Sequence, residues 1–141
     1  MPYQLEVSKS ISESDEKMLL SGLNHNAKLC KGMSPAESFN VMIKKEDEEV
    51  ALGGLTAVTL FGCLYVDMLW VDPSIRKLGL GKRLMQEAEK IARTRSCKFA
   101  TVNTMDWEAL PFYQKLGYEV EFIRKGFEKD STMYMLRKPL N

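Results

Sequence analysis

Two glycines and a group of cations gather where an apolar strand gives way to a helix. The stretch DPSIRKLGLGKRLM, residues 72–85, holds Gly79 and Gly81, one residue apart, at the predicted start of that helix. Four cations surround the glycines: Arg76, Lys77, Lys82 and Arg83. A helix N-terminus already carries partial positive charge and unpaired N–H groups, so cations there are misplaced unless an anion binds beside them. The sequence therefore favours a phosphate-type site, and a tight turn without a ligand is the alternative.

Two familiar nucleotide-binding patterns do not fit this loop. The chain has no GxxxxGK[ST] motif, and the dinucleotide pattern GxGxxG fails because Leu84 stands three residues after Gly81. What remains is Arg-x-x-Gly-x-Gly, from Arg76 to Gly81, preceded by LWVDPSI.

This loop resembles the acyl-CoA pyrophosphate loop, [Q/R]-x-x-G-x-[G/A], of the GNAT superfamily of N-acetyltransferases. A second segment, DWEALPFYQKLGYE, resembles the family's N-x-x-A-x-x-F-Y-x-x-x-G-[F/Y]. It matches at Ala109, Phe112, Tyr113, Gly117 and Tyr118, with Asp106 in place of Asn. The resemblance is sharp from about residue 64 to residue 120, and it implies an enzyme that uses acetyl-CoA.

The resemblance implies where the cofactor lies. The strand before the loop splays from the next strand, Phe99–Asn103, and its backbone from Met68 to Val71 pairs with the pantetheine arm. A backbone N–H near Met68 or Leu69 polarises the thioester carbonyl. The implied cofactor-binding residues are Met68, Leu69, Trp70, Val71, Arg76, Lys77, Leu78, Gly79, Leu80, Gly81, Lys82, Asn103 and Asp106.

Catalytic roles fall to a tyrosine and a carboxylate. Tyr113 matches the position that many members use as general acid toward the CoA thiolate, and we assign its neighbour Phe112 to the core. Asp67 interrupts an apolar strand, where desolvation would favour a general base, and Tyr65 would share its pocket. Asp67 as a bystander that holds the substrate cation, and deprotonation through water, are the alternatives.

Other polar and aromatic residues near the motifs have structural alternatives. Asp106 is expected mainly to cap the helix that follows it, a role open to Asn, Asp or Ser. Asn103 could supply the polar contact to the cofactor instead. Trp70 and Trp107 are expected to pack, and Pro111 is tolerated in the first turn of its helix.

The elements that position these residues follow from hydrophobic periodicity. A strand is predicted at Tyr3–Val7, a helix at Ser12–Lys31, a turn or short helix at Ser34–Ser38, and a three-stranded meander up to Val71. Later elements are a helix at Gly79–Arg95, a strand in KFATVNT, a helix in DWEALPFYQKLG and two strands in YEVEFIRK and STMYMLRK. The fold class is a single α/β domain over residues 1–141, a mixed, mostly antiparallel sheet with parallel splayed central strands and helices on both faces.

Composition limits the partners. A net charge of +1 over 141 residues argues against nucleic acid and an anionic membrane. The chain opens without a charged-then-apolar leader and has no membrane-length apolar run, which favours a cytoplasmic protein. Cys30, Cys63 and Cys97 lack metal or disulfide spacing, and His25 lacks partners, so no metal is expected. The closing strands make a homodimer possible by analogy.

The sequence favours an acetyl-CoA-dependent N-acetyltransferase that moves an acetyl group to a primary amine by direct attack. No covalent intermediate is required, because no cysteine near the motifs has an adjacent base. The alternative is a non-catalytic acyl-CoA-binding regulatory module. A small-molecule amine is slightly favoured over a protein amine as acceptor, and the sequence does not identify it.

Overall fold

A computed structural model describes residues 2–141 as two compact units, one ending at Ala36 and one running from Glu37 to Asn141. The single domain over residues 1–141 that the sequence predicts stays a prediction. No helix among the described residues is long and apolar enough to span a bilayer.

The N-terminal unit holds one helix, α1 (Glu13–Lys31). Its N-cap is Ser12, whose hydroxyl accepts a hydrogen bond from the Asp15 N–H at 3.1 Å, as the Ser-x-x-Asp pattern predicts. Gly32 ends the helix in the left-handed conformation, φ 66°, and donates its N–H to the Lys28 carbonyl. The strand predicted at Tyr3–Val7 is wrong, because these residues carry no regular structure and a strand needs a partner to hold its backbone groups.

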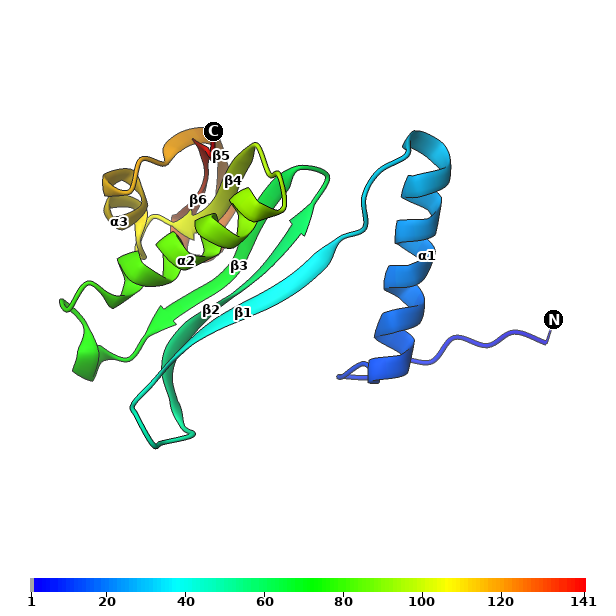
Figure 1. Cartoon of the computed structure of the whole chain (residues 1–141), viewed down its shortest axis with the longest axis horizontal. Coiled ribbons are helices and arrows are strands. Elements are labelled where there is room, and N and C mark those ends of the chain that lie inside the picture. The colour runs from blue at the N-terminus through cyan, green and yellow to red at the C-terminus, as the bar shows by residue number, and fades with distance from the viewer. Residues whose placement is uncertain (1) are drawn as a thin grey trace. The chain divides into compact units, whose positions relative to one another are not determined.

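The second unit is built on a six-stranded mixed sheet of order β1-β2-β3-β4-β6-β5 (Figure 1). Only β3 and β4 run parallel, and the other neighbours are antiparallel. The strands are β1 (Glu37–Lys44), β2 (Ala51–Leu60), β3 (Cys63–Val71), β4 (Phe99–Met105), β5 (Glu119–Phe127) and β6 (Ser131–Pro139). The sequence prediction of a meander, a crossover and two closing strands is confirmed.

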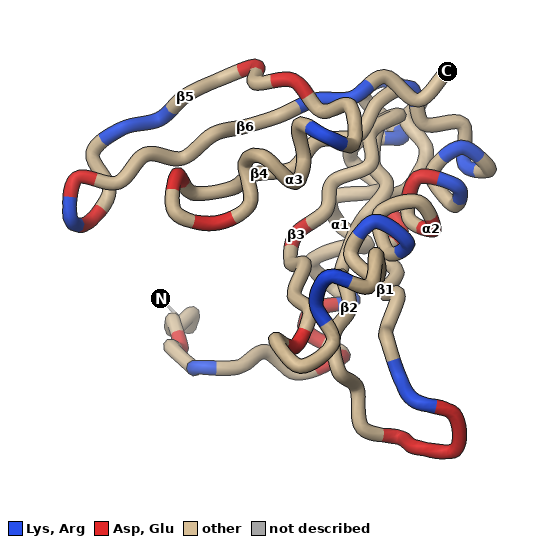
Figure 2. Tube along the Cα trace, turned by 90° about the vertical axis from the view of Figure 1, so that its left-hand side faces the viewer, with Lys and Arg blue, Asp and Glu red and all other residues tan. Residues whose placement is uncertain are grey.

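Short turns of charged or glycine-containing sequence separate the antiparallel strands. Figure 2 shows the β1–β2 turn as adjoining blue and red segments that project beyond the sheet, which matches the predicted charged turn at residues 46–49. Phe61 and Gly62 turn the chain between β2 and β3, both with positive φ. The short turn or helix expected at Ser34–Ser38 is wrong, since β1 already begins at Glu37.

Helix α2 (Leu80–Thr94) makes the crossover between the parallel strands and packs on β1, β2 and β3 (Figure 1). Its apolar stripe buries Leu84, Met85, Ala88 and Ala92 against inward side chains of the sheet. Helix α3 (Leu110–Lys115) joins the same core and is shorter than predicted. Helices on both faces of the sheet stay a prediction, because that arrangement also involves α1.

Candidate active site

The parallel strands β3 and β4 are paired only over the first half of β3 and then separate. Their pairing runs from Cys63 opposite Phe99 to Val66 opposite Val102, although β3 continues to Val71. On its other side β3 keeps its pairing with β2 as far as Val71 opposite Gly53. The second half of β3 therefore presents one backbone edge without a strand partner. This is the splay that the resemblance implies.

A β-bulge marks the point of separation. Thr56 of β2 lies opposite Met68 and the next residue, Ala57, lies opposite Val66, so Asp67 has no partner across the ladder. Asp67 is exposed. The prediction that Asp67 lies in apolar surroundings is therefore wrong. The bulge removes this residue from the regular alternation of inward and outward side chains along the strand.

After β3 the chain passes through a short 3₁₀ turn, Pro73–Ile75, into the glycine loop. The Arg76 Nε donates to the Val71 carbonyl at 2.8 Å, which ties the loop to the end of the strand. Asp72 accepts hydrogen bonds from the backbone N–H and the hydroxyl of Ser74, and these bonds lower the pKa of its carboxyl group. The Asp72 carboxylate is thus engaged by Ser74 within the loop.

The start of α2 leaves donors free. Gly79 is its N-cap residue, in the left-handed conformation at φ 77°, and no side chain caps the helix. Leu80, Gly81 and Lys82 then have N–H groups without an acceptor in the helix. The first turn holds no acidic residue. Free N–H groups beside the predicted cations are an anion-binding arrangement.

A cleft of about 770 Å³ joins the splayed strand to this helix start. It is lined by Leu69, Trp70, Val71, Ile75, Arg76, Lys77, Gly79, Leu80, Gly81, Lys82, Trp107, Glu108, Ala109, Phe112 and Lys115. A Cβ on Gly81 would lie 3.2 Å from the Phe112 ring, so this glycine lets α2 approach α3 closely. The structure thus brings the two sequence motifs together in the lining of one cavity.

Most of the predicted cofactor-binding residues line this cleft, and four do not. Met68 and Leu78 are 61% and 68% exposed and lie outside its lining. The Asn103 amide donates to the Tyr65 hydroxyl at 3.4 Å. Asp106 accepts from the Thr132 N–H at 3.3 Å, while its own N–H donates to the Thr132 carbonyl at 2.9 Å.

The expected cap of α3 by Asp106 is wrong. The helix begins only at Leu110, with Ala109 as its N-cap residue and no side-chain cap. The Thr104 hydroxyl accepts from the Ala109 N–H instead, at 3.0 Å. Pro111 does stand in the first turn, as expected.

Sequence reasoning missed several lining residues, all but one from the region of α3. They are Ile75, Trp107, Glu108, Ala109, Phe112 and Lys115. Trp70 and Trp107 were expected to pack, yet they are 56% and 70% exposed and line the cleft. The match of Ala109 and Phe112 to the second motif was the signal for that wall.

The chain is similar in sequence to known acetyltransferases. The acetyltransferase (GNAT) family profile matches residues 7–118. The chain belongs to the GNAT acetyltransferase family. It is 36% identical over 107 residues to blasticidin-S acetyltransferase of Streptomyces morookaense, covering 75% of this chain and 78% of that protein.

Solved GNAT structures share the fold. An Agrobacterium tumefaciens protein assigned as an acetyltransferase superposes with a TM-score of 0.79 at 27% identity, over 97% of this chain and 99% of that one. A Bacillus anthracis protein assigned as a streptothricin acetyltransferase, solved with acetyl coenzyme A, gives a TM-score of 0.65 at 18% identity, over 72% and 62%. This protein is accordingly an N-acetyltransferase, and acetyl-CoA is the cofactor of its family.

Two rings of the second GNAT motif are placed differently from expectation. Phe112, assigned to the core, lines the cleft, whereas Tyr113 is 6% exposed in the core. Tyr113 packs edge-on against Phe112 and Tyr118, with centroids 5.1 and 5.9 Å away. Burial, and secondarily the charge of Glu108, raises the pKa of Tyr113 to about 12. Its hydroxyl has no hydrogen-bond partner among residues 2–141.

Metal ligands are not assembled here. Within the described part of the chain, no three His, Cys, Asp or Glu side chains come together in a way that could hold a metal ion.

Proposed function

We propose that this enzyme transfers the acetyl group of acetyl-CoA to a primary amine by direct attack within a ternary complex. The observation that carries the proposal is the cleft itself, with an unpaired strand edge at one end and an uncapped, cation-flanked helix start at the other. A donor with an amide-bearing arm and a pyrophosphate matches both ends chemically.

The donor would lie along β3 with its pyrophosphate at the start of α2. The pantetheine amides would pair with the free edge of residues 67–71, and a backbone N–H near Met68 or Leu69 would polarise the thioester carbonyl. Arg76, Lys77 and Lys82 would neutralise the phosphates. Met68 can serve this role through its backbone although its exposed side chain is not part of the cleft lining.

The reaction needs no group beyond donor and amine. The amine nitrogen attacks the carbonyl carbon, the new C–N bond forms, and the C–S electron pair returns to sulfur as the carbon–sulfur bond breaks. One proton leaves the attacking nitrogen, and one is taken up by the departing thiolate. The net products are an N-acetyl amide and CoA.

Tyr113 is proposed as the group that offers a proton to the thiolate. Its raised pKa keeps the phenol protonated throughout the neutral range. The Tyr113 hydroxyl oxygen is not among the fully buried unpaired atoms of the described residues, so its proton can be offered to an acceptor atom that the ligand supplies. The role requires access from the cleft past Phe112, with which the Tyr113 ring is in contact.

Asp67 is proposed to receive the proton of the amine, directly or through water. Its place at the bulge puts it where β3 leaves β4, beside the residues assigned to the thioester. Because Asp67 is exposed, a chain of water molecules can reach it. Its carboxylate would also attract a cationic acceptor before deprotonation.

For the acceptor, a small-molecule amine is favoured over a protein amine. The support is the Streptomyces morookaense relative, which is named for acetylating blasticidin S. The alternative function, a non-catalytic acyl-CoA-binding regulatory module, predicts binding without turnover.

One experiment separates these functions. Calorimetry measures acetyl-CoA binding, and thiol release is then followed in the same sample against small amines and lysine peptides. We expect binding and turnover in the wild type, with Asp67→Asn and Tyr113→Phe binding normally and turning over about 10²-fold more slowly. Binding without release on any amine would support the regulatory module, and no binding would refute the proposal.

A further inference from the structure

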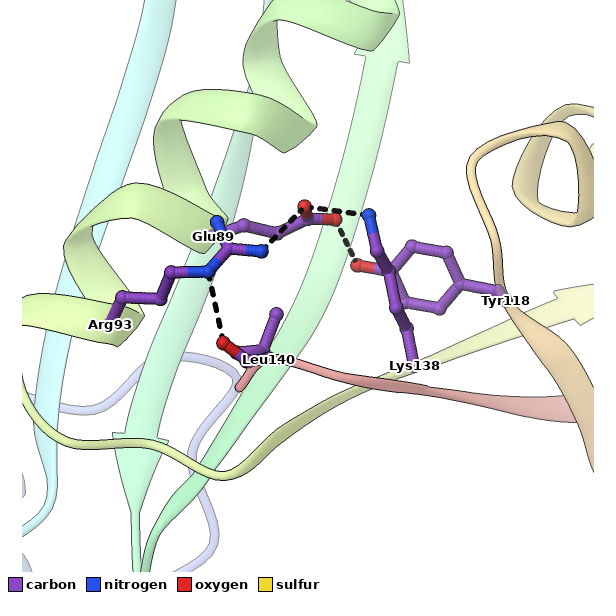
Figure 3. A network of polar contacts seen from close by, with 5 residues as sticks. All are labelled: Glu89, Arg93, Tyr118, Lys138 and Leu140. Atoms are coloured by element: carbon purple, nitrogen blue, oxygen red, sulfur yellow. Dashed lines mark hydrogen bonds and ion pairs between the residues drawn. The ribbon is translucent and has the colours of Figure 1, made fainter.

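Thr56 of β2 carries the one buried side-chain oxygen that has no hydrogen-bond partner among residues 2–141. Buried polar groups elsewhere in the same unit are bonded within the protein. Figure 3 shows Glu89, which is 3% exposed and accepts hydrogen bonds from the Tyr118 hydroxyl at 2.7 Å and the Lys138 ammonium at 2.9 Å. An unpaired buried hydroxyl costs free energy, so a fold that keeps one calls for a partner that a ligand would supply.

Thr56 lies beside the point where β3 leaves β4. It stands opposite Met68 at the bulge, next to Asp67, which has no partner across the ladder. Side chains alternate along a strand, and the neighbours Leu55 and Ala57 are buried in the core that α2 covers. The Thr56 side chain therefore belongs to the opposite face of the sheet, directly across from the residue proposed to polarise the thioester.

Further polar side chains continue this face across the neighbouring strands. Asn40 of β1 is exposed and pairs directly with Thr56. On the other side Tyr65 of β3 pairs with Thr101 of β4, and Asn103 stands two residues farther along β4. The Asn103 amide donates to the Tyr65 hydroxyl at 3.4 Å, and the proton of that hydroxyl has no acceptor among residues 2–141. Asn40, Thr56, Tyr65, Asp67 and Asn103 are called the polar band below.

The polar band holds a single charge. Asp67 is its only ionised group, and the other four residues are neutral donors and acceptors. The nearest cation on β6 is Arg137, which pairs with Thr101, lies 3.6 Å from the Glu121 carboxylate and stacks over the Phe99 ring at 4.0 Å. Arg137 is thus engaged within the protein and leaves the charge of Asp67 uncompensated.

This composition selects among amines. A polyamine would need several carboxylates, and the polar band offers one. A plain alkylamine would leave the hydroxyl and amide groups of the polar band without partners, which costs affinity. An amine with one positive charge and several hydroxyl or amide groups satisfies both the carboxylate and the neutral groups.

We infer that the polar band receives the acceptor and that the acceptor is a small monoamine bearing hydroxyl or amide groups. The inference rests on the proposed function, because the amine must meet the thioester beside Asp67. Asn40, Thr56, Tyr65 and Asn103 are positioning residues that bond the polar groups of the acceptor. Neighbouring strands lie about 4.8 Å apart, so a band from β1 to β4 spans about 14 Å, the length of a molecule of one or two rings.

Thr56→Val tests the band, because it removes the hydroxyl and nearly keeps the shape of the side chain. We expect the melting temperature of the ligand-free protein to rise by about 3 °C, since the unpaired hydroxyl is gone. The KM for galactosamine should rise about fivefold, the loss of one hydrogen bond, while acetyl-CoA affinity stays unchanged.

Thr59→Val is the matched control on the same strand. Thr59 lies on the core face, and its hydroxyl donates to the Glu37 carbonyl at 3.4 Å and accepts from the Arg95 guanidinium at 3.0 Å. This variant should have a lower melting temperature and the galactosamine KM of the wild type. The two substitutions are chemically identical, so opposite results separate a hydroxyl kept for a ligand from one that stabilises the fold.

The acceptor class is tested by turnover of four amines. Galactosamine and serinamide carry hydroxyl or amide groups, whereas hexylamine and spermidine carry neither. We expect kcat/KM for at least one of the first pair to exceed that for both of the second pair by about tenfold. Thr56→Val and Tyr65→Phe should each reduce this preference several-fold.

The contrary results fall on different claims. If acetyl-CoA does not bind, or binds without turnover of any amine, the proposed function itself fails. If hexylamine, spermidine or lysine peptides are the better acceptors, the transfer reaction stands and the inferred acceptor class is overturned. A lower melting temperature of Thr56→Val would mean that its hydroxyl is bonded within the protein, and an unchanged galactosamine KM would mean that it meets no acceptor; either result overturns the role of the polar band.

Discussion

Helix α2 carries charge in opposite ways at its two ends. At the N-terminal end the cations Arg76, Lys77 and Lys82 lie beside free N–H groups, and the first turn has no carboxylate. Toward the other end Glu89 is buried and held by Tyr118 and Lys138. The first arrangement leaves charge for a ligand, and the second consumes it within the protein.

Residues that bind the ligand and residues that stabilise the fold can therefore be told apart along α2. Unpaired cations on the surface contribute little to folding, because water solvates them well, and they are retained at a cost in repulsion. A buried carboxylate with partners contributes strongly to the free energy of unfolding, because the loss of one partner leaves the others buried without a hydrogen bond or an opposite charge. Substitutions at the two ends of α2 should therefore have opposite effects on affinity and on the free energy of unfolding.

The largest effect should come from Glu89→Ala. It leaves the Tyr118 hydroxyl and the Lys138 ammonium without their acceptor, and we expect the free energy of unfolding to fall by about 3 kcal/mol. Urea unfolding measures this loss. Acetyl-CoA affinity of the folded variant should be no weaker, because a negative charge beside the cations has been removed. A loss below about 1 kcal/mol would show that Glu89 is not a structural anchor.

The opposite profile is expected for the double variant Arg76→Ala, Lys82→Ala. Removal of two cations from the cleft should weaken acetyl-CoA binding by roughly 30-fold, with a loss that shrinks as salt rises. The urea midpoint should stay near that of the wild type. Calorimetry at two salt concentrations checks the affinity. Normal affinity in a folded variant would remove the pyrophosphate from this end of α2.

The cation-rich end was the more predictable of the two. Its residues are contiguous in the sequence, so the glycine spacing and the misplaced charges were visible without a fold. The network around Glu89 joins α2 to Tyr118 and Lys138, which follow Glu89 in the sequence by 29 and 49 positions, and no local pattern identifies such partners. Long-range pairing of this kind depends on the register of β6 against β4.

The side chains of α3 that line the cleft show a second limit of prediction from the sequence. The second motif indicated that this segment faces the cofactor, but the side chains that point inward depend on where the helix begins. Asp106 bonds to Thr132 and Thr104 bonds to Ala109, so the helix starts at Leu110 and its phase places Phe112 rather than Tyr113 on the cleft. The bulge at Asp67 has the same origin, since it arises from the pairing of β3 with β2.

A smaller effect should appear in the pH dependence of stability. The unfolded chain releases the Tyr113 proton near pH 10, whereas the folded protein holds it until about pH 12, so folding loses stability as pH rises through this window. At pH 11 this group alone costs about 1.4 kcal/mol relative to pH 9. Tyr113→Phe lacks that cost. The difference in unfolding free energy between wild type and variant should therefore shift by about that amount between the two pH values, and an unchanged difference would contradict the burial of Tyr113.

The smallest effect is expected from Asp106→Ala, which tests a carboxylate that lies outside the cleft lining. The hydrogen bond that its carboxylate accepts from the Thr132 N–H is long and exposed. The hydrogen bond from the backbone N–H of residue 106 to the Thr132 carbonyl does not depend on the side chain and remains in the variant. We therefore expect a loss below about 1 kcal/mol in unfolding free energy and an acetyl-CoA affinity within twofold of the wild type. Asp106→Asn, which restores the residue type of the family motif, is the matched variant. If Asp106→Ala weakens binding while Asp106→Asn strengthens it, the side chain of residue 106 contacts the cofactor. Asp106 would then belong with the ligand-binding residues at the start of α2, and not with carboxylates such as Glu89 that are bonded within the protein.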